Sequence, residues 1–175
     1  MKVRKGHSFD RVSLRTAVRE HLTAQINYDP KSTIKDVLKY FSKSDLAAEL
    51  SETRDKRSKQ YKAALRNVER WTTGGKEKRT PGRIYQKRLV SLLRSQDEVL
   101  KNQAARTEDI TVKVTADITI SNDARRRTIE VDLESDEGAA FLGAAIDDPV
   151  EAYGILFEAY GVRGAFVSNA EITIE

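Results

Sequence analysis

Residues 108–121 read EDITVKVTADITIS, and apolar side chains occupy every second position of this stretch. The alternating residues that share one face are Ile110, Val112, Val114, Ala116, Ile118 and Ile120. A strict period of two over that length is typical of a β-strand with one buried face and one solvent face. The stretch therefore predicts a strand, and it marks the point at which the character of the chain changes.

The segments after this strand predict a small β-β-α-α-β region over residues 107–175. SNDARR supplies a turn, and RRTIEVDLES repeats the alternation, so the two strands should form a hairpin. DEGAAFLGAAID predicts a short helix. Asp148-Pro149 starts another helix that ends near Gly161, because Asp caps a helix and Pro suits its first position. AFVSNAEITIE predicts a third strand.

Before the strand, the sequence predicts only helices. The segments with helical spacing of apolar residues are DRVSLRTAVREHLTAQIN, STIKDVLKYF, SDLAAELS, SKQYKAALRNVERWTTGG and GRIYQKRLVSLLRSQDEVLKNQ. SETRDKRSKQ (51–60) has no apolar residue and is either a loop or a solvated helix extension. We therefore predict an α+β fold in which an all-helical helix-turn-helix region, residues 1–105, precedes the β-β-α-α-β region.

Charge divides the chain in the same place. Residues 1–106 carry 26 Lys and Arg against 12 Asp and Glu, a net charge of +14. Residues 107–175 carry 5 against 15, a net charge of −10. Such asymmetry predicts a polyanionic partner for the first half. The alternative is a solvated, Lys-rich helical surface without a partner.

Several classes of function find no support in the sequence. There is no cysteine, and the two histidines, His7 and His21, belong to no metal-spaced cluster. No glycine-rich nucleotide-binding motif occurs, and no apolar run is long enough for a secretory signal or a membrane span. We expect a cytoplasmic protein that is not an enzyme, with no metal, no cofactor, no small-molecule substrate and no membrane partner. A nuclease or integrase fragment is disfavoured, since the basic half lacks a clustered acidic set.

The stretch RNVERWTTGGKEKRTPGRIYQKRL, residues 66–89, is typical of a helix-turn-helix recognition helix and the turn that follows it. Val68 and Trp71 would seat the helix on the core while Arg66, Asn67 and Arg70 face the major groove, where Arg suits guanine and Asn suits adenine. The basic turn would contact phosphates. The alternative is an ordinary amphipathic helix that packs through Trp71. The predicted DNA-binding residues are Lys59, Lys62, Arg66, Asn67, Arg70, Lys76, Lys78, Arg79, Arg83 and Lys87.

Two further groups in the second half leave alternatives open. Tyr153, Phe157 and Tyr160 fall at helical spacing, which predicts either core or a homodimer interface. Since helix-turn-helix proteins often read two half-sites as dimers, we predict that residues 107–175 mediate dimerisation. Arg125, Arg126 and Arg127 are expected in the hairpin turn, either as phosphate contacts or as an intramolecular clamp on the acidic strands.

From about residue 60 to the end, the chain loosely resembles the telomere terminal proteins of linear replicons. The resemblance rests on DARRRTIEVDLESDEGAAFLGA (123–144), the helix EAYGILFEAYG and an acidic β ending, preceded by a helix-turn-helix. Proteins of that family become covalently joined to DNA 5′ ends through a hydroxyl side chain, but the resemblance assigns that role to no residue here.

We therefore predict a helix-turn-helix protein that binds double-stranded DNA and serves a mobile or linear replicon, such as a plasmid. It would act in DNA replication, telomere maintenance or transcriptional repression. The alternative hypothesis is a structural or adaptor protein that binds nucleic acid non-specifically through its basic half.

Overall fold

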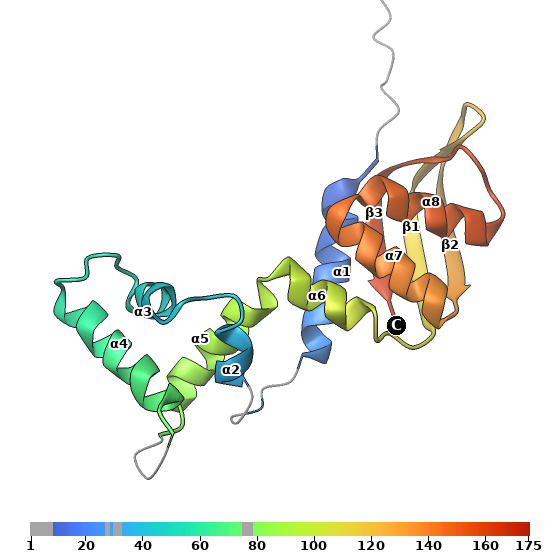
Figure 1. The fold of residues 1–175 in the computed structure, drawn as a ribbon. Coiled ribbons are helices and arrows are strands. Elements are labelled where there is room, and N and C mark those ends of the chain that lie inside the picture. The colour runs from blue at the N-terminus through green and yellow to red at the C-terminus, as the bar shows by residue number, and fades with distance from the viewer. Residues whose placement is uncertain (1–8, 27–28, 30–32, 75–78) are drawn as a thin grey trace, which may run out of the picture. The chain divides into compact units, whose positions relative to one another are not determined.

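The computed structural model of the protein describes residues 9–26, 29, 33–74 and 79–175. The chain divides into two compact units (Figure 1). The sheet unit joins the segment that ends at Ile26 to Asp97–Glu175, and the helical unit consists of Asn27–Gln96. The helical unit is therefore inserted into the chain of the sheet unit.

The sheet unit contains three antiparallel strands in the order β2-β1-β3. They are β1 (Ile110–Ile120), β2 (Asp123–Leu133) and β3 (Phe166–Ile174). The predicted hairpin is confirmed, with a register that runs without interruption from Ile120 opposite Asp123 to Ile110 opposite Leu133. Its turn residues, Ser121 and Asn122, both have positive φ angles of 48° and 69°, as a tight two-residue hairpin turn requires.

Two helices, α7 (Ser135–Asp147) and α8 (Pro149–Tyr160), cover the buried face of this sheet (Figure 1). Asp148 caps α8 by accepting a hydrogen bond from the Val150 N–H, at 3.0 Å, as the Asp-Pro pair predicts. At Gly138 of α7 an added Cβ would lie only 3.1 Å from Ile110, so glycine permits the close approach of this helix to β1. The predicted α+β fold and the β-β-α-α-β order are confirmed.

The aromatic stripe of α8 belongs to the core. Tyr153 is fully buried and Phe157 is 4% exposed, whereas only Tyr160, at 46%, reaches solvent. Of the two alternatives for this stripe, the structure favours core. A dimer surface built on all three residues was the wrong expectation, because the first two already pack inside the unit.

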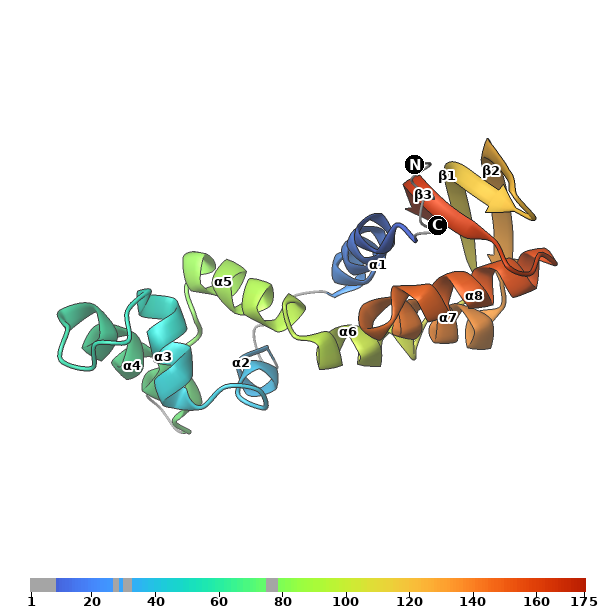
Figure 2. The ribbon, with the colours of Figure 1, turned by 90° about the horizontal axis from the view of Figure 1, so that it is seen from above.

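Helices α1 (Arg11–Gln25) and α6 (Asp97–Ala104) also belong to the sheet unit. α1 buries Leu14, Val18 and Leu22 completely and packs on β3 and α7 (Figure 1 and Figure 2). The division predicted between residues 105 and 107 therefore does not coincide with the compact units. The charge of a segment does not determine which core it packs on. The apolar stripe of α1 packs on the sheet, so α1 belongs to the sheet unit.

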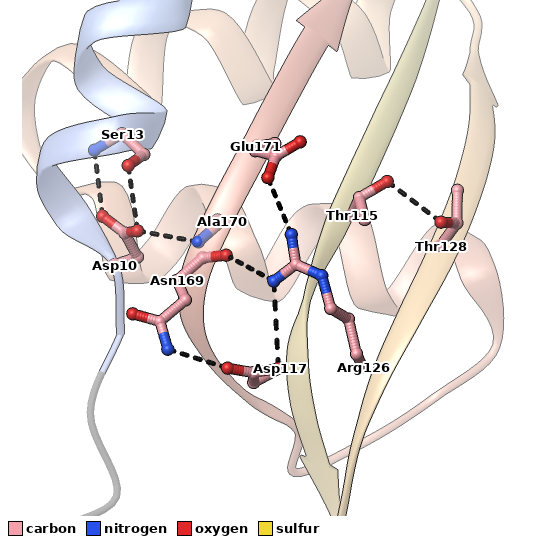
Figure 3. A network of polar contacts seen from close by, with 9 residues as sticks. All are labelled: Asp10, Ser13, Thr115, Asp117, Arg126, Thr128, Asn169, Ala170 and Glu171. Carbon is pink, nitrogen blue, oxygen red and sulfur yellow. Dashed lines mark hydrogen bonds and ion pairs between the residues drawn. The ribbon is translucent and has the colours of Figure 1, made fainter.

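Asp10 joins α1 to the rest of the sheet unit through every polar group it has, and Figure 3 shows the contacts of its carboxylate with Ser13 and Ala170. Its carboxylate accepts hydrogen bonds from the Ser13 N–H and hydroxyl, at 3.0 and 2.9 Å, and from the Ala170 N–H at 2.9 Å. Its backbone N–H donates to the Val167 carbonyl, at 2.8 Å, and its carbonyl accepts from the Tyr153 hydroxyl, at 2.9 Å. Burial alone would raise the pKa of Asp10, but the hydrogen bonds from Ser13 and Ala170 outweigh it and lower the pKa.

The helical unit consists of α2 (Thr33–Val37), α3 (Lys43–Ser51), α4 (Lys59–Thr72) and α5 (Arg83–Arg94). Its buried side chains include Leu46, Leu50, Val68, Trp71 and Leu89. Seven residues, 52–58, connect α3 to α4, so the charged stretch 51–60 is mainly a loop and not a helix extension.

The single long helix predicted over residues 82–103 is wrong. The chain leaves α5 after Arg94 and begins α6 at Asp97. The Ser95 hydroxyl donates to the Leu92 carbonyl, at 2.7 Å, and Asp97 forms an ion pair with Arg19 of α1. The break is therefore stabilised by a contact with a residue far away in the sequence, which periodicity does not reveal.

We predict that Asp10→Asn makes the stability of the sheet unit less dependent on pH in the acid range. Because the pKa of Asp10 is lower in the folded protein than in the unfolded chain, its contribution is present above about pH 4 and disappears as pH falls through the folded value. Urea unfolding between pH 2 and 7 measures the effect, with Asp10→Ala expected to cost about 1–2 kcal/mol at neutral pH. An unchanged acid slope in Asp10→Asn would contradict this role.

The inserted arrangement generates a second prediction. α1 and α6 run parallel, since Arg19 meets Asp97 and Gln25 accepts a hydrogen bond from Gln103 at 3.0 Å. The six residue steps from Asp97 to Gln103 span only about 9 Å of helix, so the end of α1 lies close to the start of α6. Replacing residues 27–96 by about eight Gly and Ser residues, which reach about 26 Å, should therefore leave a sheet unit that unfolds cooperatively. Circular dichroism during heating measures this, with the fragment 107–175 as the less stable comparison because it lacks α1. Loss of cooperative unfolding in the linked chain would disprove the autonomy of the sheet unit.

Candidate nucleic-acid interface

The helical unit concentrates positive charge. Residues 27–96 carry 18 Lys and Arg against 8 Asp and Glu, a net charge of +10. The remaining residues carry 13 against 19, a net charge of −6. The basic character predicted for the first half is thus carried mainly by the inserted unit, and residues 1–26 supply the remaining net charge of +4.

α4 is held by its caps and by one buried face. The Ser58 hydroxyl accepts a hydrogen bond from the Tyr61 N–H, at 3.1 Å, and starts the helix. Four side chains at helical spacing are buried: Tyr61, Ala64, Val68 and Trp71. The Tyr61 hydroxyl bonds with that of Ser44 in α3, at 2.8 Å, which fixes the start of α4 against its neighbour. The apolar stripe predicted for this helix is therefore a packing face, as both interpretations of the stretch require.

The opposite face of α4 carries a row of cations that we call the basic stripe: Lys59, Lys62, Arg66 and Arg70. All four side chains are exposed, and none forms an ion pair or hydrogen bond within the part of the chain that the structure describes. Successive members are three or four residues apart, which places them along one side of the helix over about 16 Å. The stripe therefore presents four unneutralised charges to solvent.

Asn67 departs from the predicted orientation. Its side chain is half-buried, and its amide donates a hydrogen bond to the Tyr85 hydroxyl of α5 at 3.3 Å. Tyr85 also packs against Trp71, with ring centroids 5.1 Å apart. Asn67 thus lies on the side of α4 that faces α5 and not with Arg66 and Arg70. One helical step of 100° separates it from Arg66, which is enough to move it out of the stripe.

The other predicted site residues lie beyond α4. Arg79 is exposed, and its backbone N–H bonds to the Arg70 carbonyl at 3.3 Å, which brings the end of the turn back to the end of α4. Arg83 and Lys87 are exposed on one side of α5. Lys76 and Lys78 lie outside the described residues. The turn and α5 thus add at least three exposed cations to the helical unit.

Two features of this unit escaped the sequence analysis. Arg88 donates from Nη1 to the Leu50 carbonyl at the end of α3, at 2.6 Å, and pairs through Nη2 with the carboxylate of Glu52. A cation at a helix C-terminus is favourable, but only the fold brings α5 to this end of α3. Ile84, the neighbour of Arg83, is 76% exposed. Its exposure could not be inferred from the sequence, because it lies in an otherwise regular amphipathic helix.

The three consecutive arginines of β2 are engaged within the sheet unit. Arg125 and Arg127 each pair with Asp123, at 2.9 Å. Arg126 donates to Glu171 at 2.8 Å and to the Asn169 carbonyl at 3.3 Å, and lies 3.9 Å from Asp117 (Figure 3). All three belong to the strand and not to the turn. Of the two alternatives, these contacts favour the intramolecular clamp.

The described residues contain no group of three or more His, Asp or Glu side chains placed to hold a metal ion. No described helix is both long and apolar enough to cross a membrane. Comparison with protein-family models, curated proteins and solved structures finds no match for the chain. The resemblance to telomere terminal proteins therefore stays a prediction.

The contrast between Arg88 and the basic stripe predicts different effects on stability. Arg88→Ala should destabilise the helical unit by about 1 kcal/mol, less than a buried charged hydrogen bond contributes, because the side chain is 42% exposed. The double variant Arg66→Ala/Arg70→Ala should leave the unfolding midpoint unchanged within error, since neither side chain contacts a partner in the part of the chain that the structure describes. Thermal unfolding followed by Trp71 fluorescence compares them, and a large loss of stability in the double variant would show that the stripe has a structural role.

Proposed function

We propose that the helical unit binds double-stranded DNA through α4, in a homodimeric binding protein and not an enzyme. The observation that carries the proposal is the basic stripe, four exposed cations that have no partner among the described residues, opposite a buried packing face. Side chains that have no role within the fold are available to a polyanion, and phosphate neutralisation with counterion release favours such a complex. The biological setting that we propose is replication, telomere maintenance or repression in a mobile or linear replicon.

The geometry of α4 suits the major groove. An α-helix with its side chains is about 10–12 Å wide, and the groove is about 12 Å wide. Arg66 and Arg70 lie at the middle and end of the stripe, where bidentate contacts to guanine are available to them. Arg79, Arg83 and Lys87 would then contact phosphates beside the groove. The connection between α3 and α4 has seven residues, longer than the roughly four of an ordinary helix-turn-helix, so the proposal rests on α4 itself.

One observation favours the second candidate function, non-specific binding of nucleic acid. Asn67 is the one amide side chain among the residues predicted to contact bases, and it donates its hydrogen bond to the Tyr85 hydroxyl instead. Without it, the stripe has only cations with which to discriminate between bases. Lysines neutralise phosphates without regard to sequence, so specificity depends on Arg66 and Arg70.

We predict that Arg66→Ala/Arg70→Ala weakens binding to a preferred duplex more than to its scrambled counterpart. Each lost base contact costs about 1–3 kcal/mol and relaxes the preference at one position. The preferred duplex is enriched from a random pool by the wild-type protein, and affinities are measured by fluorescence anisotropy. Arg106→Ala/Arg163→Ala, which removes two exposed arginines outside the helical unit, is the matched control and should change little.

Salt provides the second readout of this experiment. If the protein neutralises about six phosphates, affinity should fall about a thousandfold between 50 and 200 mM salt. Equal weakening of both duplexes by the double variant, with a salt slope about two units lower, would favour the non-specific function. Salt-independent binding, or none, would refute DNA binding by the helical unit.

A further inference from the structure

The outer edge of β2 is an eleven-residue strand edge without a partner among the described residues. β2 pairs with β1 along its whole length, and no backbone group of its other edge bonds to another described segment. The opposite edge of the sheet is different, because Phe9 bridges to Val167 and Asp10 bonds to both Val167 and Ala170 of β3. Among the described residues, the edge of β2 is thus the one that no other segment pairs with.

The register identifies the backbone groups that face outward from β2. Thr111 exchanges two hydrogen bonds of 3.0 Å with Glu175 at the end of β3, so the backbone of Thr111 points toward β3. Alternation then points Ile110 and Val112 toward β2, where their partners are Leu133 and Val131. The outward N–H and C=O groups of β2 therefore belong to the intervening residues: Ala124, Arg126, Thr128, Glu130 and Asp132.

Natural strand edges are commonly blocked by proline, by a bulge, by a covering segment or by charged side chains. β2 contains no proline, and its register with β1 has no bulge. Arg125 and Arg127, which could repel an incoming strand, are both paired with Asp123 in the same strand. The edge is long, regular and locally neutralised, which is the geometry of a strand that receives another strand.

The side chains of this edge are complementary to themselves. Arg126, Glu130 and Asp132 lie on the exposed face of the sheet, with the cation toward the start of β2 and the carboxylates toward its end. Within the unit they contact Glu171, Lys113 and Thr111, and because contacts between exposed charged side chains contribute little, pairs with a second copy can replace them. In an antiparallel pair of two β2 strands, a two-fold axis at Ile129 places Arg126 opposite Asp132 of the second copy, and an axis at Thr128 places it opposite Glu130. Both registers form the favourable pair twice, and cross-strand opposite charges stabilise a sheet.

We propose that a second copy of this chain pairs antiparallel with β2, so that the two sheets form one six-stranded sheet across a two-fold axis. This inference rests on the homodimer of the proposed function and assigns its interface to the outer edge of β2. A closed two-fold interface uses the same patch on both copies, which the charge order of β2 satisfies. The edge lies in the sheet unit, so the basic stripe of each copy stays unused by the interface.

The test measures the molar mass of the full chain by sedimentation equilibrium, without DNA. The wild-type protein should be a dimer at about 10 μM, where a complex of micromolar affinity is largely formed. Thr128→Pro removes one outward N–H, which an edge strand tolerates, and should give a monomer. Glu130→Lys/Asp132→Lys places cations opposite Arg126 of the second copy and should weaken self-association about a hundredfold.

Glu151→Lys/Glu158→Lys is the matched control, since it adds the same charge on exposed positions of α8 and should stay dimeric. Circular dichroism checks folding, and the Lys variant keeps the test decisive if the proline variant unfolds. A monomeric wild-type protein at about 100 μM overturns both the homodimer and its surface. A dimer that survives both β2 variants overturns the surface alone. Neither result bears on DNA binding, which has its own assay.

Discussion

The carboxylate and backbone of Asp10 form the junction on which the sheet unit depends. This residue makes five hydrogen bonds. They cap the start of α1, attach it to β3 at Val167 and Ala170, and satisfy the hydroxyl of the buried Tyr153, which donates to the Asp10 carbonyl. α1 in turn seats Leu14, Val18 and Leu22 in the core, and it pairs with α6 through Arg19 and Gln25. The two ends of the inserted helical unit are thus anchored to the same pair of helices, so the insertion leaves the core of the sheet unit intact.

Local patterns were sufficient for the strands and for most helix ends. The alternation of residues 110–120 and the Asp148-Pro149 pair act through the residues that carry them, so the sequence alone identifies β1 and the start of α8. The division into units and the break between α5 and α6 could not be found in this way. An apolar stripe does not state which surface it covers, and the ion pair of Asp97 reaches back to Arg19 across 78 positions. Both depend on partners that no local window contains.

In the candidate interface, too, the sequence identified the features that depend on local spacing and missed those that depend on neighbouring helices. Periodicity separates the buried face of α4 from the basic stripe, because those two faces lie on opposite sides of the helix. Asn67 lies between them, and a residue on the flank takes its role from the neighbouring helix, here from Tyr85 of α5. Arg88 shows the converse, since its spacing marks it as one more surface cation whereas the fold places it at the C-terminus of α3. A sequence gives the number of cationic side chains. Only the tertiary structure separates those that make contacts within the fold, such as Arg88, from those that have no partner among the described residues.

The discontinuous chain of the sheet unit affects how the protein folds during its synthesis on the ribosome. α1 is synthesised before the rest of the two units, yet Ala170, which anchors its cap Asp10, lies 160 positions after Asp10. The core residues of the helical unit all lie between Ile34 and Leu93, so that unit can fold while the rest is still being made. Until β3 leaves the ribosome, Leu14, Val18 and Leu22 have no strand to cover. Contacts of such large sequence separation form slowly, so nascent chains should carry an exposed apolar helix, the kind of segment to which chaperones bind.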